Sequence, residues 1–184
     1  MALWMIRAGR RGEYAEKFIK DHCFYITWSD LNCDLAGFHS RDEIKHKLRE
    51  IYPDVKTNTI RIWASQIWMG SHEISVGDWV ILPLKTQPTI WIGEVVQGYQ
   101  FDPAAASPYF HRIPVKWIGE NIPRSNFAQD LLFSFGASLT ICRISRNNAE
   151  ERLRNMEKSR WAAGSDGYVT MDLSADETEE TFQD

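Results

Sequence analysis

The sequence predicts an α+β domain in which two or three helices flank a curved, barrel-like mixed β-sheet. Its 184 residues match the length of one ordinary domain, and 43% of them are hydrophobic, which is enough to bury a core. Apolar residues recur at helical spacing up to residue 71, and strand-like apolar runs follow from Val76. Mixed strands around a few helices are typical of α+β folds.

The N-terminal region predicts a strand, a glycine-containing turn, a helix and a second strand. Leu3–Ala8 is a short apolar run, and Glu13–Asp21 has apolar residues at helical spacing. Cys23–Trp28 is rich in β-forming residues, whereas Ser29–Phe38 contains Asp, Asn and Gly without periodicity. A tryptophan, Trp28, therefore stands where a strand runs into an irregular loop.

Two helices are expected next. Ser40 followed three residues later by Glu43 is a capping box, and Pro53 ends the helix that it starts. A second helix is predicted over about Thr59–Ser71, where apolar residues lie at i, i+3 and i+7.

The second half of the chain is expected to form the sheet and to end in a charged helix. The predicted strands and helices are Asp78–Leu84, Thr89–Val96 and Ile113–Ile118 as strands, Phe127–Phe133 as a short helix, Ser138–Ile144 as a closing strand, and Asn147–Trp161 as the charged helix. We therefore divide the chain into a domain at 1–146, a helical segment at 147–163 and an acidic flexible tail at 164–184.

Charge is distributed unevenly along the chain. Seven of the 25 acidic residues lie from Asp166 onward with no Lys or Arg among them, which leaves 18 acidic residues against 21 basic residues before Asp166. A mildly basic body is compatible with binding a polyanion.

The sequence predicts a cytoplasmic protein without membrane, metal or cofactor. Its longest apolar runs, such as Trp79–Leu84, are far shorter than the roughly 18 residues that a membrane span needs, and no secretory signal opens the chain. Cys23, Cys33 and Cys142 form no C-x-x-C pair and have no His at zinc spacing. We therefore expect neither a disulfide framework nor a structural metal site.

Motifs of known catalytic chemistry are absent from the sequence. It has no G-x-S-x-G elbow, P-loop, H-E-x-x-H or G-x-G-x-x-G. A nuclease of the PD-(D/E)-x-K kind needs acids and a Lys on adjacent strand positions to hold Mg²⁺, but Asp42 to Lys45 and Glu43 to Lys47 lie in a predicted helix. The chain by itself is expected to be non-catalytic.

Two features are compatible with binding a nucleic acid. The basic, glycine-containing segment from Arg7 to Gly12, which includes Arg10 and Arg11, follows a strand and is suited to presenting guanidinium and backbone N–H groups to a phosphate. An ordinary surface turn would account for the same residues.

The second feature is the placement of aromatic residues. Trp28 is followed by Ser29 and Asp30, so an indole face stands beside hydrogen-bonding groups, which is what holding an unstacked base requires. Core packing is the alternative for Trp28 and for Trp63, whereas Trp79, Trp91 and Trp117 alternate with aliphatic residues and are expected in the core. Further aromatic residues lie in or beside a Pro- and Ala-rich loop, where they mark a binding surface: Tyr99, Phe101, Tyr109 and Phe110.

Five short motifs follow one another between Leu3 and Ile144. They are Trp4-Met-Ile-Arg7-Ala-Gly-Arg, Ile26-Thr-Trp28-Ser-Asp30, Val76-Gly77-Asp78, Trp91-Ile-Gly93-Glu94-Val95 and Phe110-His-Arg-Ile-Pro-Val115-Lys116-Trp117. Their order and spacing resemble the PUA-like superfamily that includes the YTH and EVE domains. They are most similar to the EVE-like N-terminal modules of bacterial Mrr-type, modification-dependent restriction proteins.

The resemblance implies a PUA-like sheet and a site for a modified or flipped base. Trp28 matches the first cage tryptophan of YTH domains, and Arg7 matches a basic position near the nucleic acid. The second cage aromatic would come from the loop between Tyr99 and Phe110, which matches in placement but not in sequence. Mrr-type proteins carry a nuclease domain after this module, so a nuclease domain or subunit is an implied partner.

The leading hypothesis is a reader of modified bases, in DNA rather than RNA, in a bacterial restriction or defence system associated with the nucleoid. Trp28 and Trp63, with Tyr99, Tyr109 or Phe110, would enclose the extruded base. Ser29, Asp30 and Gln66 would read its edge, and Arg7, Arg10, Arg11 and Lys116 would attract phosphates.

Three alternatives remain open. The ASCH branch of the same superfamily includes proteins that resemble small amidohydrolases acting on modified nucleosides, and Lys116 with Glu94 or Asp30 is the candidate catalytic set. An RNA reader of N6-methyladenine is the second alternative. In the third, the helix over Asn147–Trp161 is a partner surface, although packing against the sheet is the favoured interpretation of that helix.

Overall fold

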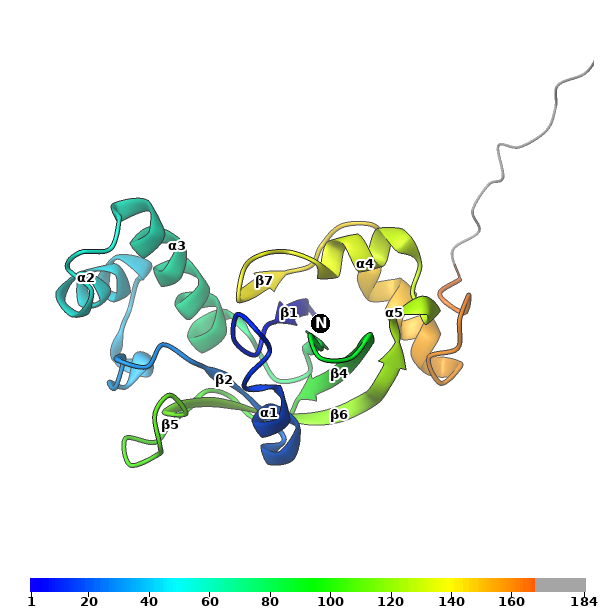
Figure 1. The fold of residues 1–184 in the computed structure, drawn as a ribbon, viewed down its shortest axis with the longest axis horizontal. Coiled ribbons are helices and arrows are strands. Elements are labelled where there is room, and N and C mark those ends of the chain that lie inside the picture. Colours follow the sequence, from blue (N-terminus) through cyan, green and yellow to red (C-terminus); the bar gives the residue numbers. More distant parts are fainter. Residues whose placement is uncertain (168–184) are drawn as a thin grey trace, which may run out of the picture.

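The computed structural model describes residues 1–167, and one curled β-sheet organises these residues (Figure 1). The strand order is β2-β6-β4-β3-β1-β7, with β5 paired to β6 beside this path. The strands are β1 (Leu3–Ile6), β2 (Cys23–Ile26), β3 (Trp79–Pro83), β4 (Thr89–Val95), β5 (Gln100–Phe101), β6 (His111–Pro123) and β7 (Ile141–Arg143). The expected α+β class with a curved, barrel-like mixed sheet is confirmed, but residues 1–167 contain five α-helices where two or three were expected.

Strand β6 is long enough to join the two halves of the sheet. Its first residues pair antiparallel with β2, and the rest pairs antiparallel with β4. The β4–β6 register shifts between Ile90 and Gly93, and such irregularities bend and twist a strand pair. At Gly93 an added Cβ would lie 3.1 Å from the Trp117 ring, so a glycine lets that indole lie directly on β4.

Helices cover both faces of the sheet. They are α1 (Ala15–Asp21), α2 (Arg41–Ile51), α3 (Thr57–Trp68), α4 (Gln129–Phe135) and α5 (Ala149–Lys158), with short turns at Leu35–Gly37, Met69–Glu73 and Arg124–Asn126. The predicted cap of α2 is confirmed, because the Ser40 hydroxyl accepts a hydrogen bond from the Glu43 N–H at 3.2 Å. No helix in residues 1–167 is long and apolar enough to cross a membrane.

Two hydrophobic clusters lie on the two faces of the sheet. One packs α1, α2 and α3 against one face and contains Trp91 and Trp117. The other packs α4 and α5 against the opposite face and contains Trp79 and Trp161. The expectation that Trp79, Trp91 and Trp117 are core residues is therefore confirmed.

The edges of the curled sheet meet on the turn that follows α3. An added Cβ at Gly70 would lie 2.9 Å from the Cδ1 atoms of both Ile26 on β2 and Ile141 on β7, so glycine lets both isoleucines pack closely on this turn. One turn earlier, the Gln66 side-chain carbonyl accepts hydrogen bonds from the backbone N–H groups of Thr140 at 2.7 Å and Ile141 at 3.1 Å. Gln66 therefore accepts the backbone hydrogen bonds that a neighbouring strand would accept from β7. Its side chain is buried, with 4% of the residue exposed. This role differs from the predicted reading of a base edge.

The segment after α5 returns to the body of the protein. Asp166 is only 7% exposed and accepts hydrogen bonds from the Arg152 guanidinium, and the Trp161 indole donates to the Ile118 carbonyl at 3.1 Å. The folded part thus extends beyond residue 164, where the acidic tail was expected to begin, and 168–184 lie outside the described residues. Leu153 and Met156 of α5 are buried, which confirms the predicted packing of this helix against the sheet.

Candidate functional site

Three aromatic rings gather where β2 ends. Trp28 follows β2, and its ring lies edge-to-face against Trp63 of α3, with centroids 6.2 Å apart. Trp63 in turn contacts Tyr52, which follows α2, at 5.4 Å. All three rings are half-buried and pack on the hydrophobic cluster beneath. We call Trp28, Tyr52 and Trp63 the tryptophan cluster.

Polar groups border the tryptophan cluster. Ser29 and Asp30 are exposed next to Trp28, as the sequence predicts. Burial raises the pKa of the Tyr52 hydroxyl, and Asp30 is the charged group beside that hydroxyl. The cluster therefore combines partly accessible indole surface with one carboxylate and one phenol, which suits a flat ligand that carries hydrogen-bonding groups on its edge.

Tyr109 belongs to a neighbouring group of tyrosines. Its ring lies 5.0 Å from Tyr25 and 5.8 Å from Tyr14, and the Lys17 ammonium stands 5.3 Å from its centroid. The loop that carries Tyr109 also reaches the tryptophan side of the molecule, because the Ser107 hydroxyl donates to the Ser29 carbonyl at 3.2 Å. The loop of Tyr109 thus lies beside the tryptophan cluster, but the Tyr109 ring itself contacts tyrosines.

Tyr99 and Phe110 point into the protein and not toward a ligand. The Tyr99 hydroxyl is 2.6 Å from Nδ1 of His111 and accepts a hydrogen bond from the Leu35 N–H at 3.0 Å. Phe110 is only 7% exposed and packs edge-on against His111. These two predicted walls of the base pocket are therefore structural, because hydrogen bonds and burial already engage them.

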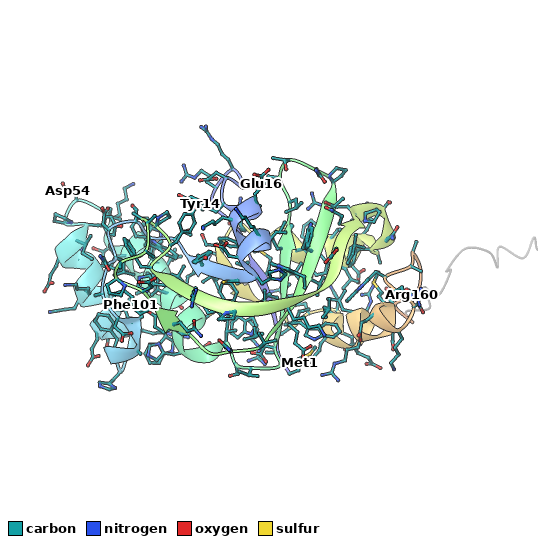
Figure 2. The ribbon with its side chains drawn as sticks, turned by 90° about the horizontal axis from the view of Figure 1, so that it is seen from below. Met1, Tyr14, Glu16, Asp54, Phe101 and Arg160 are labelled. Carbon is teal, nitrogen blue, oxygen red and sulfur yellow. The ribbon has the colours of Figure 1, made fainter. Side chains whose placement is uncertain are left out.

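His111 holds the loop that carries Trp28. Its side chain is fully buried, and its Nε2 lies within hydrogen-bond distance of the Leu31 carbonyl. Because a carbonyl only accepts, Nε2 carries the proton and Nδ1 accepts from Tyr99. The Tyr99 and Phe101 rings are nearly parallel to the imidazole. Figure 2 shows Phe101 at the same end of the molecule as Asp54, with Arg160 at the opposite end. Asp54 belongs to the loop that connects α2 to α3.

Three of the basic side chains predicted to bind phosphate lie in or beside the turn after β1. Arg10 and Arg11 are exposed in the turn after β1, beside Glu13, whose carboxylate accepts a hydrogen bond from the Arg11 N–H at 2.8 Å. Hydrogen bonds from the backbone N–H groups of Glu13 and Arg11, together with the charges of the neighbouring arginines, lower the pKa of the Glu13 carboxyl. Arg7 lies at the bottom of this turn, where its guanidinium donates to the Ser138 carbonyl at 2.8 Å.

Lys116, the fourth predicted phosphate contact, lies on β6 and not in this turn. It is exposed between Val115 and Trp117, which point into the cluster on which Trp28 packs. Because side chains alternate along a strand, Lys116 projects from the opposite face of the sheet, across from Glu94 of β4. Neither a phosphate contact beside Trp28 nor convergence with Asp30 in a hydrolase pocket fits this position.

A cleft of about 490 Å³ opens beside Arg7. The turn after β1, the β3–β4 hairpin, the end of β6 and the α4–β7 connection form its walls, and two further cations, Lys85 and Arg124, line it. Sequence reasoning missed these two residues and Tyr52. Residues 1–167 contain no group of three or more His, Cys, Asp or Glu side chains arranged to hold a metal ion.

Comparison with known families assigns the chain to one of them. A model of a family described as a domain of unknown function, DUF8426, matches residues 4–135, which is more than half of the chain. The chain belongs to this family. The part matched by DUF8426 runs from β1 to the end of α4 and includes the tryptophan cluster, Arg10, Arg11 and the three cations of the cleft.

Curated proteins and solved structures add little to the DUF8426 assignment. No curated protein matches the chain. A solved structure described as a hypothetical protein from Leishmania major is similar at 12% sequence identity and a TM-score of 0.38, covering 87% of this chain and 96% of that one.

Proposed function

We propose that this DUF8426 protein is a nucleic-acid-binding module that reads a modified base in DNA, with the extruded base held on the tryptophan cluster. The observation that carries the proposal is the pair of half-buried indoles, Trp28 and Trp63, beside an exposed carboxylate at the rim of a curled sheet. The resemblance of the sequence motifs to EVE and YTH domains supports the same function, as the recognition part of a bacterial restriction or defence system.

The chemistry of the rim narrows the class of base. Asp30 offers carboxylate oxygens that accept hydrogen bonds, so it suits a base edge that donates. Cytosine N4, adenine N6 and guanine N2 carry amino groups that donate, whereas thymine has no amino group. We therefore propose a modified base that carries an exocyclic amino group as the ligand, and the cytosine and adenine modifications are tested first.

The free energy gained by stacking a base on the tryptophan cluster is comparable to the cost of extruding that base from the duplex. Unstacking and unpairing a base costs a few kcal/mol, and stacking on an aromatic side chain returns about 1–3 kcal/mol per base. Hydrogen bonds to Asp30 and the Tyr52 hydroxyl would offset the remainder. Phosphate attraction by Arg10 and Arg11 would supply affinity that does not depend on sequence.

We expect Trp28→Ala to lower affinity for the preferred modified duplex by roughly tenfold to a hundredfold, the loss of one stacking surface. The panel consists of duplexes with cytosine, 5-methylcytosine, 5-hydroxymethylcytosine or N6-methyladenine, and matching RNA strands. Trp68→Ala is the matched control, because Trp68 is also half-buried but stacks on His72.

The control variant should keep its preference for the modified duplex, and Trp28→Ala should stay folded by circular dichroism. A folded Trp28→Ala protein that still prefers the modified duplex would place the base elsewhere. Tighter binding of the RNA strands would instead indicate an RNA reader.

Reversing the charge of Arg10 and Arg11 should weaken binding to all duplexes alike. Each lost phosphate contact lowers the slope of log affinity against log salt by roughly one unit, while the ratio of modified to unmodified affinity stays constant. Fluorescence anisotropy at four salt concentrations measures both quantities. The control is Arg61→Glu with Arg49→Glu, which makes the same charge change on α3 and α2. An unchanged salt slope in the Arg10 and Arg11 variant would exclude these arginines from the interface.

A further inference from the structure

We propose that the cleft beside Arg7 is a binding site for a phosphate ester, separate from the tryptophan cluster. We call it the cationic cleft and define it by Arg7, Lys85 and Arg124. The proposal does not depend on base reading, because Trp28, Tyr52 and Trp63 are not among the residues that line the cleft.

The charged side chains that line the cleft are all cations. Its three cations come from three places in the fold, namely the end of β1, the β3–β4 hairpin and the residue after β6. No Asp or Glu is among its lining residues, and the polar neighbours are Thr86, Gln87 and Ser138. Within residues 1–167, none of the three cations forms an ion pair with a carboxylate. A bound anion would provide the missing counter-charge.

The two arginines are also partly removed from water. Arg7 and Arg124 are half-buried, and a charge in that position is stabilised by a partner of opposite sign. The Ser138 carbonyl holds one Nη of Arg7, which orients the planar guanidinium before any ligand arrives. Guanidinium groups bind phosphate oxygens in a bidentate manner, so an oriented arginine favours phosphate over a simple halide.

A close approach of two loops builds the cleft. Gly12 has a φ of +72°, and an added Cβ there would lie 3.0 Å from Cβ of Lys85, so the turn after β1 packs directly on the β3–β4 hairpin. This contact also sets exposed Arg10 and Arg11 in the turn at the border of the cleft. A glycine is needed there for both its backbone conformation and its lack of a side chain.

The size and walls of the cleft indicate the ligand class. Its volume of about 490 Å³ lies within the range of roughly 300–1,000 Å³ typical of small-molecule sites. Leu84, Pro88 and Ala137 add apolar surface beside the cations. A phosphate group attached to a nucleoside-sized body fits this combination. That chemistry is shared by a free nucleotide and by one nucleotide of a DNA strand.

The test is titration calorimetry with three probes: inorganic phosphate, AMP and an unmodified single-stranded DNA tetranucleotide. The variant carries Lys85→Gln and Arg124→Gln, which remove two charges without touching the Arg7–Ser138 hydrogen bond. The matched control carries Lys45→Gln and Arg61→Gln. Those residues line another surface cleft that contains Asp42, so the same charge is removed where an acid is already present.

We expect the cleft variant to weaken binding of the best probe roughly tenfold or more, from the loss of two charge-assisted contacts, and the control to stay within about twofold. AMP binding more tightly than the tetranucleotide would identify a free nucleotide as the source of the phosphate, and the reverse order would identify a DNA strand. No saturable binding of any probe at millimolar concentration, or equal weakening in the control, would overturn the proposal. The preference for a modified duplex should survive in the cleft variant, which separates this site from the proposed base reading.

Discussion

Arg152→Met is expected to lower the free energy of unfolding by about 3–5 kcal/mol, because it removes the cation that pairs with the buried carboxylate of Asp166 and with the more exposed one of Asp130. The Arg152 side chain is 3% exposed and donates to Asp166 through Nε at 3.0 Å and Nη2 at 2.9 Å. It also binds Asp130 of α4 and lowers the pKa of that carboxyl through these hydrogen bonds. The arginine thus connects α5, α4 and the segment that follows α5.

Urea denaturation followed by circular dichroism measures this loss. The control is Arg154→Met on the same helix, since Arg154 is exposed and pairs with Glu150 at 3.6 Å. Exposed ion pairs contribute only about 0–1 kcal/mol, so the control should unfold close to the unmodified protein. Changing Asp130 and Asp166 to Asn in the Arg152→Met protein should recover part of the stability, because the negative charges that Arg152 paired with are then removed as well. Equal unfolding of the two arginine variants would show that the buried network contributes nothing.

Most of the fold was predictable because the signals for its elements are local. The Ser40 cap marks the start of α2, and strand-like runs mark β3 and β4. Strand β6 is longer than expected, since Ile113–Ile118 was predicted and His111–Pro123 is observed. Gly119 and Asn121 have the composition of a turn, but Asn121 takes a positive φ of 44° within the strand, and the pairing continues past it.

The candidate site was predictable only where one segment forms it. Trp28, Ser29 and Asp30 are adjacent in sequence, and a strand end followed by polar residues is visible there. Tyr52, Lys85 and Arg124 reach their places through long-range packing that no local pattern reports. The local sequence also did not predict the roles of Gln66 and Phe110. Gln66 contacts β7, which is far from it in the sequence, and Phe110 is buried and packs against His111.

Acid is expected to destabilise the protein through His111. Burial lowers the pKa of this histidine below its ordinary value of 6.5. At pH values between the lowered pKa of folded His111 and its ordinary value, the folded protein therefore binds fewer protons than the unfolded chain. The stabilisation is fully present above about pH 6.5 and is lost as pH falls through the lower pKa of the folded state. Protonation would place a hydrogen on Nδ1, where the Tyr99 hydroxyl now donates, and would loosen the loop between Leu31 and Leu35.

His111→Phe should lower the free energy of unfolding at pH 7.5 by about 2–4 kcal/mol. The variant leaves the Leu31 carbonyl and the Tyr99 hydroxyl without their partner, at about 1–3 kcal/mol for each buried group, and keeps an aromatic ring between Tyr99 and Phe101. It should also flatten the decline in melting temperature between pH 7.5 and pH 5. His46→Phe is the control, since His46 is exposed on α2 and should leave the pH dependence unchanged. Because the His111 contacts hold the loop after Trp28, affinity for the modified duplex should fall together with stability. A His111→Phe protein with unchanged stability and unchanged pH dependence would show that this histidine does not support the loop.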